Sequence, residues 1–352
     1  MNIKSSFFLA LCFGLTILVA GCRKPGPEPA AEAPEFPWQI DRFADLKILR
    51  YQVPGFESLT ASQKELVYYL SEAALAGRDI IFDQNYKHNL RIRKTLDAIV
   101  RGYKGDRKDP RWNEFMIYVK RVWFSNGIHH HYSTDKIMPG FDADYFAALV
   151  RDSEGQSFPL AEGQSVDDLL AFLRPILFDP SVDAKKISQD STKDLVLNSA
   201  VNFYEGVTQA EVEKYYKGIV DGKDTTPISY GLNSRVVKKD GKVLEEVASI
   251  NGLYGPAIAK IVYWLEKAAG VAENEQQRPE IGRARFFAMQ EKGAHQQDHT
   301  QRRQNPAQNG RKISGAHAYC RPHRVVARPQ REKRPHGDVH NSRREVLLIG
   351  NL

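Results

Sequence analysis

Three consecutive histidines are the residues of this 352-residue chain whose type best fits metal or acid–base chemistry. The segment around them reads Asn126-Gly127-Ile128-His129-His130-His131-Tyr132. In an extended strand His129 and His131 would share one face, about 7 Å apart along the chain. A catalytic zinc needs three protein ligands, which helical histidines four residues apart with a nearby Glu supply more reliably. The interpretations left open are a metal site, a structural turn, and a cleft lined by His129, His130, His131 and Tyr132.

Paired carboxylates could also carry acid–base chemistry. Asp142 with Asp144 and Asp167 with Asp168 are the pairs considered. Each pair stands where a helix is expected to begin, and acidic residues there cap the helix and complement its dipole. We therefore interpret both pairs as structural, and we assign no catalytic residue and no metal ligand from these patterns.

The charge of the chain changes near Gln277. Residues 1–277 hold 34 basic and 37 acidic residues with 33 of the 36 aromatic ones, whereas residues 278–352 hold 16 basic and only 6 acidic residues. The net charge of +7 therefore comes from the last fifth of the chain. This Arg- and His-rich tail is interpreted as an out-of-frame translation or as a basic arm that binds RNA or a membrane. Its low apolar content predicts disorder in either case.

The amino-terminal segment is typical of a secreted lipoprotein. Lys4 precedes an apolar run from Phe7 to Ala20, which has the length of a signal-peptide core. The residues Val19-Ala20-Gly21-Cys22 resemble a bacterial lipobox, so residues 1–21 are predicted to be removed and Cys22 to carry the lipid. Residues 22–35 form a Pro-rich tether. The predicted location is the cell envelope outside the cytoplasm, in the periplasm or at the outer membrane.

Residues 36–277 are predicted to fold as a mostly helical α+β body with a small β component. Helices are expected from their apolar periodicity and caps, with the first capping box at residues 62–65. The expected helices cover residues 66–77, 90–102, 112–124, 144–150, 166–174 (ending before Pro175), 195–204, 209–220 and 256–269. A strand is expected at 45–53, and Asp240-Gly241 predicts a hairpin between 228–238 and 242–247. The body contains no cysteine, so it holds no disulfide and no thiolate metal site.

Three segments of the body resemble the amino-terminal half of bacterial dipeptidyl peptidase III proteins. They are Tyr68–Ile80 (YYLSEAALAGRDI), Trp123–Ser133 (WFSNGIHHHYS) and Ile228–Ser234 (ISYGLNS). The resemblance covers roughly residues 36–277. Members of this family are zinc exopeptidases that release dipeptides from the amino end of short peptides.

The resemblance implies the lower lobe of a two-lobed zinc peptidase, whose zinc signature is His-Glu-x-x-Gly-His followed by Glu-Glu-x-x-Ala-acid. Neither motif occurs in this chain, and Glu245-Glu246-Val247-Ala248-Ser249 lacks the ending of the second. Zinc is therefore the cofactor of intact relatives, and none is expected to bind this chain. No catalytic or zinc-binding residue is carried over from the family.

These features predict a truncated, lipid-anchored, dipeptidyl peptidase III-like metallopeptidase that is inactive as written. The alternative is a surface lipoprotein that binds peptides without hydrolysing them. The expected partners are short peptides and, through the lipid anchor, the membrane. Nucleic acid is not expected as a partner, because an address outside the cytoplasm argues against a role of the tail in binding it.

Overall fold

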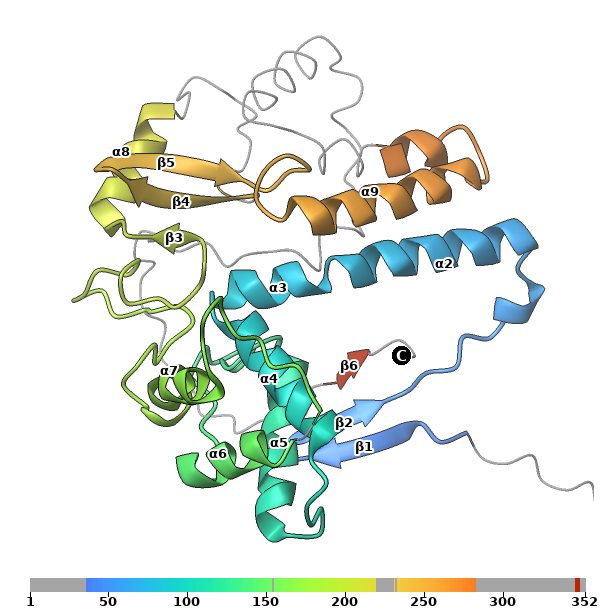
Figure 1. Ribbon diagram of the computed structural model, residues 1–352. Coiled ribbons are helices and arrows are strands. Elements are labelled where there is room, and N and C mark those ends of the chain that lie inside the picture. The colour runs from blue at the N-terminus through green and yellow to red at the C-terminus, as the bar shows by residue number, and fades with distance from the viewer. Residues whose placement is uncertain (1–35, 154, 220–230, 232, 283–345, 349–352) are drawn as a thin grey trace, which may run out of the picture. The chain divides into compact units, whose positions relative to one another are not determined.

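The computed structural model describes residues 36–153, 155–219, 231, 233–282 and 346–348 (Figure 1). The predicted signal peptide, tether and most of the predicted tail lie outside these residues. Contacts between Cα atoms divide the chain into two units, residues 1–52 with 342–352 and residues 53–341.

The smaller unit contains a sheet of three short strands. Strand β1 (Gln39–Phe43) pairs antiparallel with β2 (Leu46–Leu49), and β2 pairs in parallel with β6 (Val346–Leu348) from the predicted tail. The predicted strand at 45–53 is confirmed over β2 but ends at Leu49. The sequence did not reveal β1, because its Gln, Asp and Arg residues hide the apolar alternation and its pairing with β2 stabilises it.

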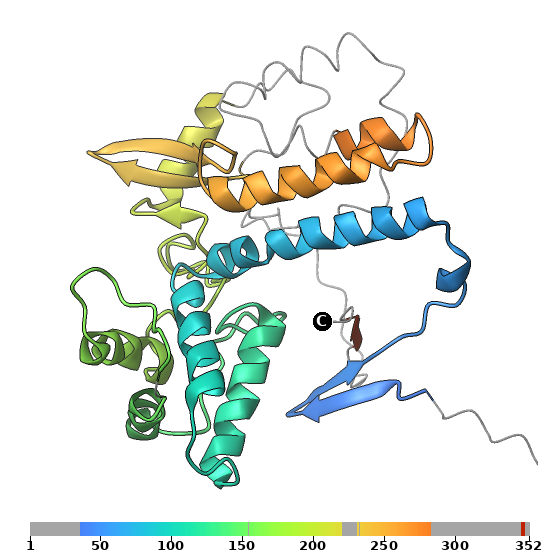
Figure 2. The ribbon, with the colours of Figure 1, turned by 45° about the vertical axis from the view of Figure 1, so that its right-hand side comes forward.

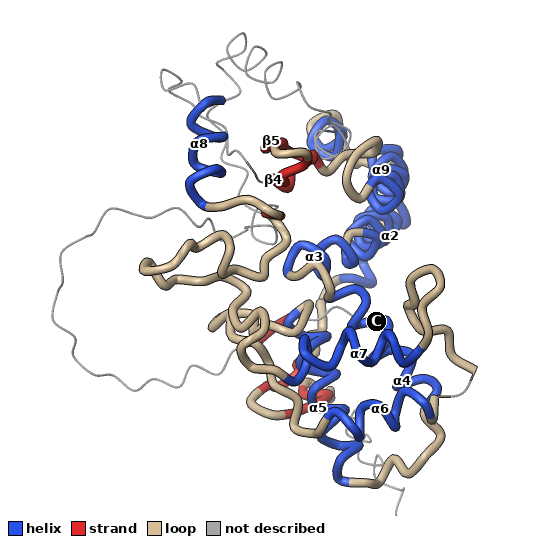
Figure 3. The backbone as a smooth tube through the Cα atoms, turned by 60° about the vertical axis from the view of Figure 1, so that its left-hand side comes forward, coloured by secondary structure: helices blue, strands red, loops and turns tan. Residues whose placement is uncertain are grey.

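The larger unit is mostly helical, as predicted (Figure 3). Its helices are η1 (Phe56–Ser58), α2 (Ala61–Ala76), α3 (Arg78–Asn85), α4 (Asn89–Gly102), α5 (Pro110–Ser125), α6 (Ala143–Arg151), α7 (Val166–Phe178), α8 (Gln209–Ile219) and α9 (Gly255–Gly270). Strands β3 (Tyr204–Glu205), β4 (Ser234–Lys239) and β5 (Lys242–Val247) form a sheet in the order β3-β4-β5. In the part of the chain that the structure describes, no helix is long and apolar enough to cross a membrane.

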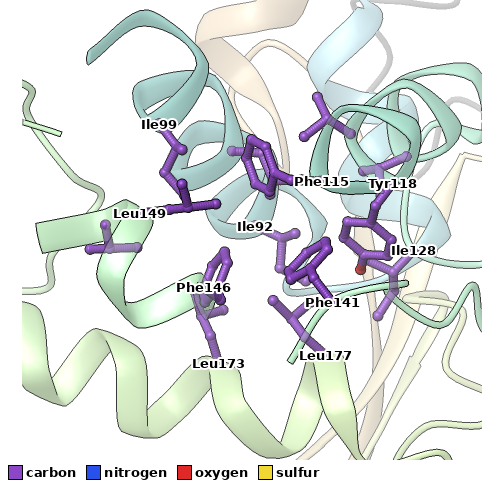
Figure 4. Packing of buried hydrophobic residues seen from close by; sticks show 14 of the residues in the cluster. Ile92, Ile99, Phe115, Tyr118, Ile128, Phe141, Phe146, Leu149, Leu173 and Leu177 are labelled. Atoms are coloured by element: carbon purple, nitrogen blue, oxygen red, sulfur yellow. The ribbon is translucent and has the colours of Figure 1, made fainter. Parts of the chain in front are cut away.

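Helices α4 to α7 surround the main hydrophobic core of the larger unit (Figure 4). The amphipathic spacing of α4 places Ile92, Leu96 and Ile99 on one fully buried face. Phe115 of α5 packs its ring against neighbouring aromatic rings, with centroids 5.2 Å from Trp112 and 5.6 Å from Phe141. Such a core follows from the helix periodicity that the sequence shows.

Helices α2 and α9 lie side by side, as Figures 1 and 2 both show. Leu66 and Ala73 of α2 pack with Leu265 and Ala268 of α9. Residues 277–282 are helical, and Ile281 is buried in the same cluster. The packed part of the chain therefore continues past the charge change at Gln277 and includes Ile281.

The capping of α2 and the end of α7 differ from the sequence prediction. The capping box of α2 is formed by Thr60 and Gln63 rather than by residues 62–65, and both of its reciprocal hydrogen bonds are present. Helix α7 continues through Pro175 to Phe178, although a stop before Pro175 was predicted. Burial of Ile176 and Leu177 in the core offsets the hydrogen bond that proline removes.

The helix predicted at 195–204 is wrong, because this segment forms a turn followed by β3. The Asp194 carboxylate accepts hydrogen bonds from the backbone N–H groups of Val196 and Leu197, both at 2.9 Å. Its other oxygen accepts from the N–H of Gln209 at the start of α8, also at 2.9 Å. A side chain that binds these N–H groups favours a turn over a continuous helix.

The predicted hairpin is confirmed, although its first strand begins only at Ser234, because Gly231 and Asn233 lie in turns. Strands β4 and β5 pair antiparallel in register from Ser234↔Val247 to Lys239↔Lys242. Asp240 and Gly241 have φ angles of 49° and 74°, as a two-residue hairpin turn of this hand requires. Residues 228–230 and 232 of the predicted first strand lie outside the described residues.

We expect Phe115→Ala to lower the free energy of unfolding by about 3–5 kcal/mol, because it removes a fully buried ring and leaves a cavity. Equilibrium urea denaturation followed by circular dichroism measures this. The exposed Leu160 provides the control, since Leu160→Ala should cost less than about 1 kcal/mol. Equal losses in the two variants would contradict the position of the core.

Candidate functional site

The histidine segment begins directly at the carboxyl end of α5. Asn126 caps the helix in the left-handed conformation, with φ of 51°, and the N–H of Gly127 donates to the carbonyl of Val122 at 2.9 Å. Gly127 has φ of 144°, and a Cβ at this position would clash with the side-chain amide of Asn89. Glycine is therefore required here both by the backbone conformation and by the close approach of Asn89.

Asn89, the first residue of α4, holds this segment in place from inside the protein. Its side chain is almost completely buried, and its Nδ2 donates to the carbonyl of Phe82 at 3.0 Å and, more weakly, to that of Asn126 at 3.4 Å. Its Oδ1 accepts from the N–H of Ile128 at 3.1 Å. Asn85 of α3 donates to the same Asn126 carbonyl at 3.1 Å. The buried Asn89 and the half-buried Asn85 thus fix the chain at the point where the histidines start.

His129 is a buried, neutral residue, with only 2% of its surface exposed. Its Nε2 lies 2.7 Å from the carbonyl oxygen of Asp183, so Nε2 carries the proton and donates it. Tyr86 places its ring edge-on to the imidazole, with centroids 5.5 Å apart, and donates its hydroxyl to Asp183 Oδ2 at 2.5 Å. Burial, as the main cause, lowers the pKa of His129 to about 4.

His130 and His131 belong to the turn that follows. The Nδ1 atom of His130 accepts hydrogen bonds from the backbone N–H groups of Tyr132 at 3.2 Å and Ser133 at 3.1 Å. The ring of His131 lies against Phe124, His130 and Tyr132, with centroids 5.0, 4.4 and 4.9 Å away. Tyr132 is the most exposed of the four candidate residues, at 67%. The segment is thus a turn beyond His130, so the extended conformation considered for His129 and His131 is wrong.

The returning chain completes the turn and ties it to residues 179–186. The N–H of Ile137 donates to the carbonyl of Ile128 at 2.8 Å, and the N–H of His130 donates to that of Asp135 at 2.7 Å. The Lys136 ammonium donates to the carbonyls of Asp179 at 2.6 Å and Val182 at 2.5 Å. Burial lowers the pKa of Lys136, opposed by the nearby carboxylates of Asp183 and Asp179. The backbone groups of this turn are therefore largely satisfied by the protein itself.

Among the described residues, no three His, Cys, Asp or Glu side chains are grouped so that they could hold a metal ion. Of the interpretations left open by the sequence, the contacts of His129 and His130 favour a structural turn. The residues that sequence reasoning missed are Tyr86, Asn89 and Asp183, which lie far from the triplet in the sequence. The position of Gly127 directly after a helix was the one local signal of a tight constraint. Lining of a cleft by residues 129–132 stays a prediction.

The carboxylate pairs have the structural roles that were predicted. Asp142 caps α6 by accepting from the N–H of Tyr145 at 2.7 Å, and Asp168 forms a capping box with Ser165 at the start of α7. Asp167 and Asp144 form exposed ion pairs with Arg151 at 2.8 Å and Arg174 at 3.2 Å.

A surface pocket of about 410 Å³ lies along α6. Its lining residues are Tyr103, Arg111, Asp142, Asp144, Tyr145, Ala148, Leu149 and Asp152. The Arg111 guanidinium stacks over the ring of Tyr145, 4.5 Å from its centroid, and pairs with Asp109 at 2.8 Å. Arg111 is therefore already paired with Asp109. The acidic residues of the pocket, Asp142, Asp144 and Asp152, lie at the two ends of α6.

No protein-family model matches this chain, and no curated protein matches it. The solved structures that are similar to it include two dipeptidyl peptidases. Dipeptidyl peptidase III (DPP III) from Caldithrix abyssi is 19% identical over 70% of this chain and 33% of that chain, with a TM-score of 0.39. Dipeptidyl-peptidase III from Corallococcus sp. strain EGB is 15% identical over 69% of this chain and 33% of that chain, also with a TM-score of 0.39. The chain thus spans about a third of the length of these structures.

We expect Gly127→Ala to destabilise the larger unit by about 1–3 kcal/mol, because alanine is strained at a φ of 144° and its Cβ would displace Asn89. Gly218 of α8 provides the matched control, since it has open space around it and a helical backbone. Gly218→Ala should leave stability unchanged or raise it by up to about 1 kcal/mol. Urea denaturation of the two variants checks the contrast, and a neutral Gly127→Ala would contradict it.

The pH dependence of stability should carry a contribution from His129. Its pKa is about 4 in the folded chain against 6.5 for an unperturbed histidine, so the unfolded chain binds the proton first as the pH falls. The stability contribution is therefore complete above about pH 6.5 and is lost as the pH falls to about 4. The expected loss is roughly 3 kcal/mol.

The variant His129→Gln tests this, because the glutamine amide can still donate to Asp183 but does not titrate. We expect its free energy of unfolding, measured in urea at steps between pH 7 and pH 4, to fall less steeply than that of the unsubstituted chain. Parallel curves for the two chains would show that His129 is not the buried titrating group.

Proposed function

We propose that the larger unit is part of the lower lobe of a dipeptidyl peptidase III-like zinc peptidase and forms one wall of a cleft for short peptides. The proposal starts from the resemblance of Tyr68–Ile80, Trp123–Ser133 and Ile228–Ser234 to that family. The observation that carries it is structural, because the first two of these segments are tied to each other by one polar network through α4.

Arg93 of α4 is the centre of this network. Its NH1 pairs with Asp79 of the first segment at 2.9 Å, and its Nε lies 3.9 Å from Asp97. Asp97 in turn accepts a hydrogen bond from the indole Nε1 of Trp123 in the second segment at 2.9 Å. The Arg93 side chain is only 10% exposed and also stacks over Phe82, 4.8 Å from the ring centroid. A largely buried guanidinium needs such partners, which supports the joint role of the two segments in one surface.

The residues of this chain do not fit a peptidase zinc site. The sequence contains neither zinc motif. His129 uses Nε2 to hold Asp183, and His130 uses Nδ1 to accept two backbone N–H groups. We therefore assign no hydrolytic step to this chain and propose that it is inactive on its own. In this proposal zinc belongs to intact relatives, and this chain supplies peptide-contacting surface.

We further propose that the protein is a bacterial lipoprotein, acylated at Cys22 and held at the cell envelope outside the cytoplasm. The support is the apolar run before Val19-Ala20-Gly21-Cys22 and the Pro-rich tether after it. No nucleic acid is proposed as a partner. Capture of peptides without hydrolysis is the alternative function, favoured by the combination of a folded core with the missing zinc motifs.

We expect the purified full chain to contain far less than one zinc ion per molecule and to leave dipeptidyl arylamides uncleaved. Elemental analysis by mass spectrometry and the release of the arylamine measure these two properties. His131→Ala provides the control for adventitious metal on the histidine turn, and it should change neither reading. One tightly bound zinc ion per chain with chelator-sensitive cleavage would overturn the proposed inactivity.

Calorimetric titration with a tetrapeptide separates the two functions that remain. Saturable binding of the uncleaved peptide would favour the peptide-binding lipoprotein, because this chain would then suffice for capture. If the peptide does not bind, the result favours the first proposal, in which the larger unit forms one wall of a cleft and needs the rest of a peptidase to bind peptides.

A further inference from the structure

Strands β1 and β2 with the residues that flank them, 36–52, form an amino-terminal hairpin that presents large apolar side chains to solvent. Trp38 is 53% exposed, and Ile40 and Tyr51 are each 55% exposed. The hairpin buries a different set of side chains, Phe43, Leu46 and Ile48. The exposed side chains therefore do not serve the packing of the hairpin, and their clustering on so small an element indicates an interaction surface.

Arg50 lies among these aromatic residues in a shallow pocket of about 280 Å³. The pocket is lined by Phe36, Trp38, Leu49, Arg50, Tyr51 and Gln52. The backbone N–H of Arg50 donates to the carbonyl of Trp38 at 2.7 Å, which fixes the two residues side by side. The guanidinium stacks over the ring of Phe36, 4.9 Å from the centroid.

The charge of Arg50 is not compensated within the described part of the chain. Its Nε is buried and has no hydrogen-bond partner there, and no ion pair of the described residues includes it. A buried guanidinium N–H without an acceptor is unfavourable, and the acceptors that match guanidinium geometry best are carboxylate and phosphate oxygens. An anionic oxygen is therefore the ligand that matches this pocket best.

A phospholipid bilayer supplies both an anionic oxygen for Arg50 and an apolar layer for the exposed side chains of the hairpin. Its phosphates can accept hydrogen bonds from Arg50, while the layer beneath them takes up apolar side chains. Trp and Tyr are the residues that favour this interface, since they combine an apolar ring with a polar group. A small soluble anion would bind Arg50 but leave Trp38 and Ile40 in water. We propose that Trp38, Arg50 and Tyr51 dock the hairpin on the headgroup layer of a bilayer that contains anionic phospholipids.

The length of chain before the hairpin is compatible with this docking. Thirteen residues lie between Cys22 and Phe36, so a lipid on Cys22 would keep the hairpin within about 50 Å of the membrane. The described residues from 36 to 52 carry three basic residues, Arg42, Lys47 and Arg50, against Asp41 and Asp45, so their charge favours an anionic surface. The inference rests on the proposed anchor for this proximity, but not for the chemistry of the pocket.

Fluorescence quenching by brominated lipids tests the docking in the full chain. The chain is bound to vesicles of phosphatidylglycerol whose acyl chains are brominated near the headgroup, and tryptophan emission is compared with that in unbrominated vesicles. We expect quenching that Trp38→Phe abolishes. Trp123→Phe is the matched control, because Trp123 is also exposed, at 38%, but lies on α5 of the other unit. That variant should keep the quenching.

Arg50→Gln tests the anionic contact. We expect stronger quenching of Trp38 in phosphatidylglycerol than in phosphatidylcholine vesicles, and loss of this difference in Arg50→Gln. Sedimentation of the chain with the vesicles reports on membrane attachment itself. If the chain sediments with vesicles but Trp38→Phe shows the same quenching as the unsubstituted chain, the lipid anchor is supported and the docking of the hairpin is overturned. Chains that do not sediment at all would overturn both.

Discussion

The buried side-chain amide of Asn89 is the constraint on which the rest of the larger unit depends. A buried amide must satisfy both its donor and its acceptor, and Asn89 does so with the carbonyl of Phe82 and the N–H of Ile128. These bonds bring the end of α3, the start of α4 and the exit from α5 to one point. The Asn89 amide leaves no room for a Cβ at position 127, so the meeting of these three elements requires a glycine there.

The same constraint decides the chemistry of the histidine triplet. Because Ile128 is held inside, the next residue enters the interior as well, and His129 becomes a neutral donor to Asp183 instead of a metal ligand. His130 then uses its Nδ1 atom to close the turn. The first two histidines are thus used to build a turn, which is consistent with our proposal that the larger unit forms one wall of a peptide cleft.

Charge is distributed differently in the two units. In the larger unit Arg93 and Arg235 are paired, the first with Asp79 at 2.9 Å and the second with Glu246 at 2.7 Å, so these cations stabilise the surface that they belong to. Arg50 of the hairpin lies among aromatic rings without such a partner in the described chain. The first arrangement fits a structural scaffold and the second an interaction surface. The proposed peptide-binding wall and the proposed contact with lipid headgroups therefore involve different units of the chain.

The sequence by itself determined those features whose cause is local. Helix α6 is capped by Asp142 and the β4–β5 turn is formed by Asp240-Gly241, because a cap and a tight turn need only neighbouring residues. Tertiary structure decided the hydrogen bond between Asn89 and Ile128 and the burial of His129 between Tyr86 and Asp183. Partners distant in the sequence supply these interactions, and a buried polar group takes whichever partner the packing brings within hydrogen-bond distance.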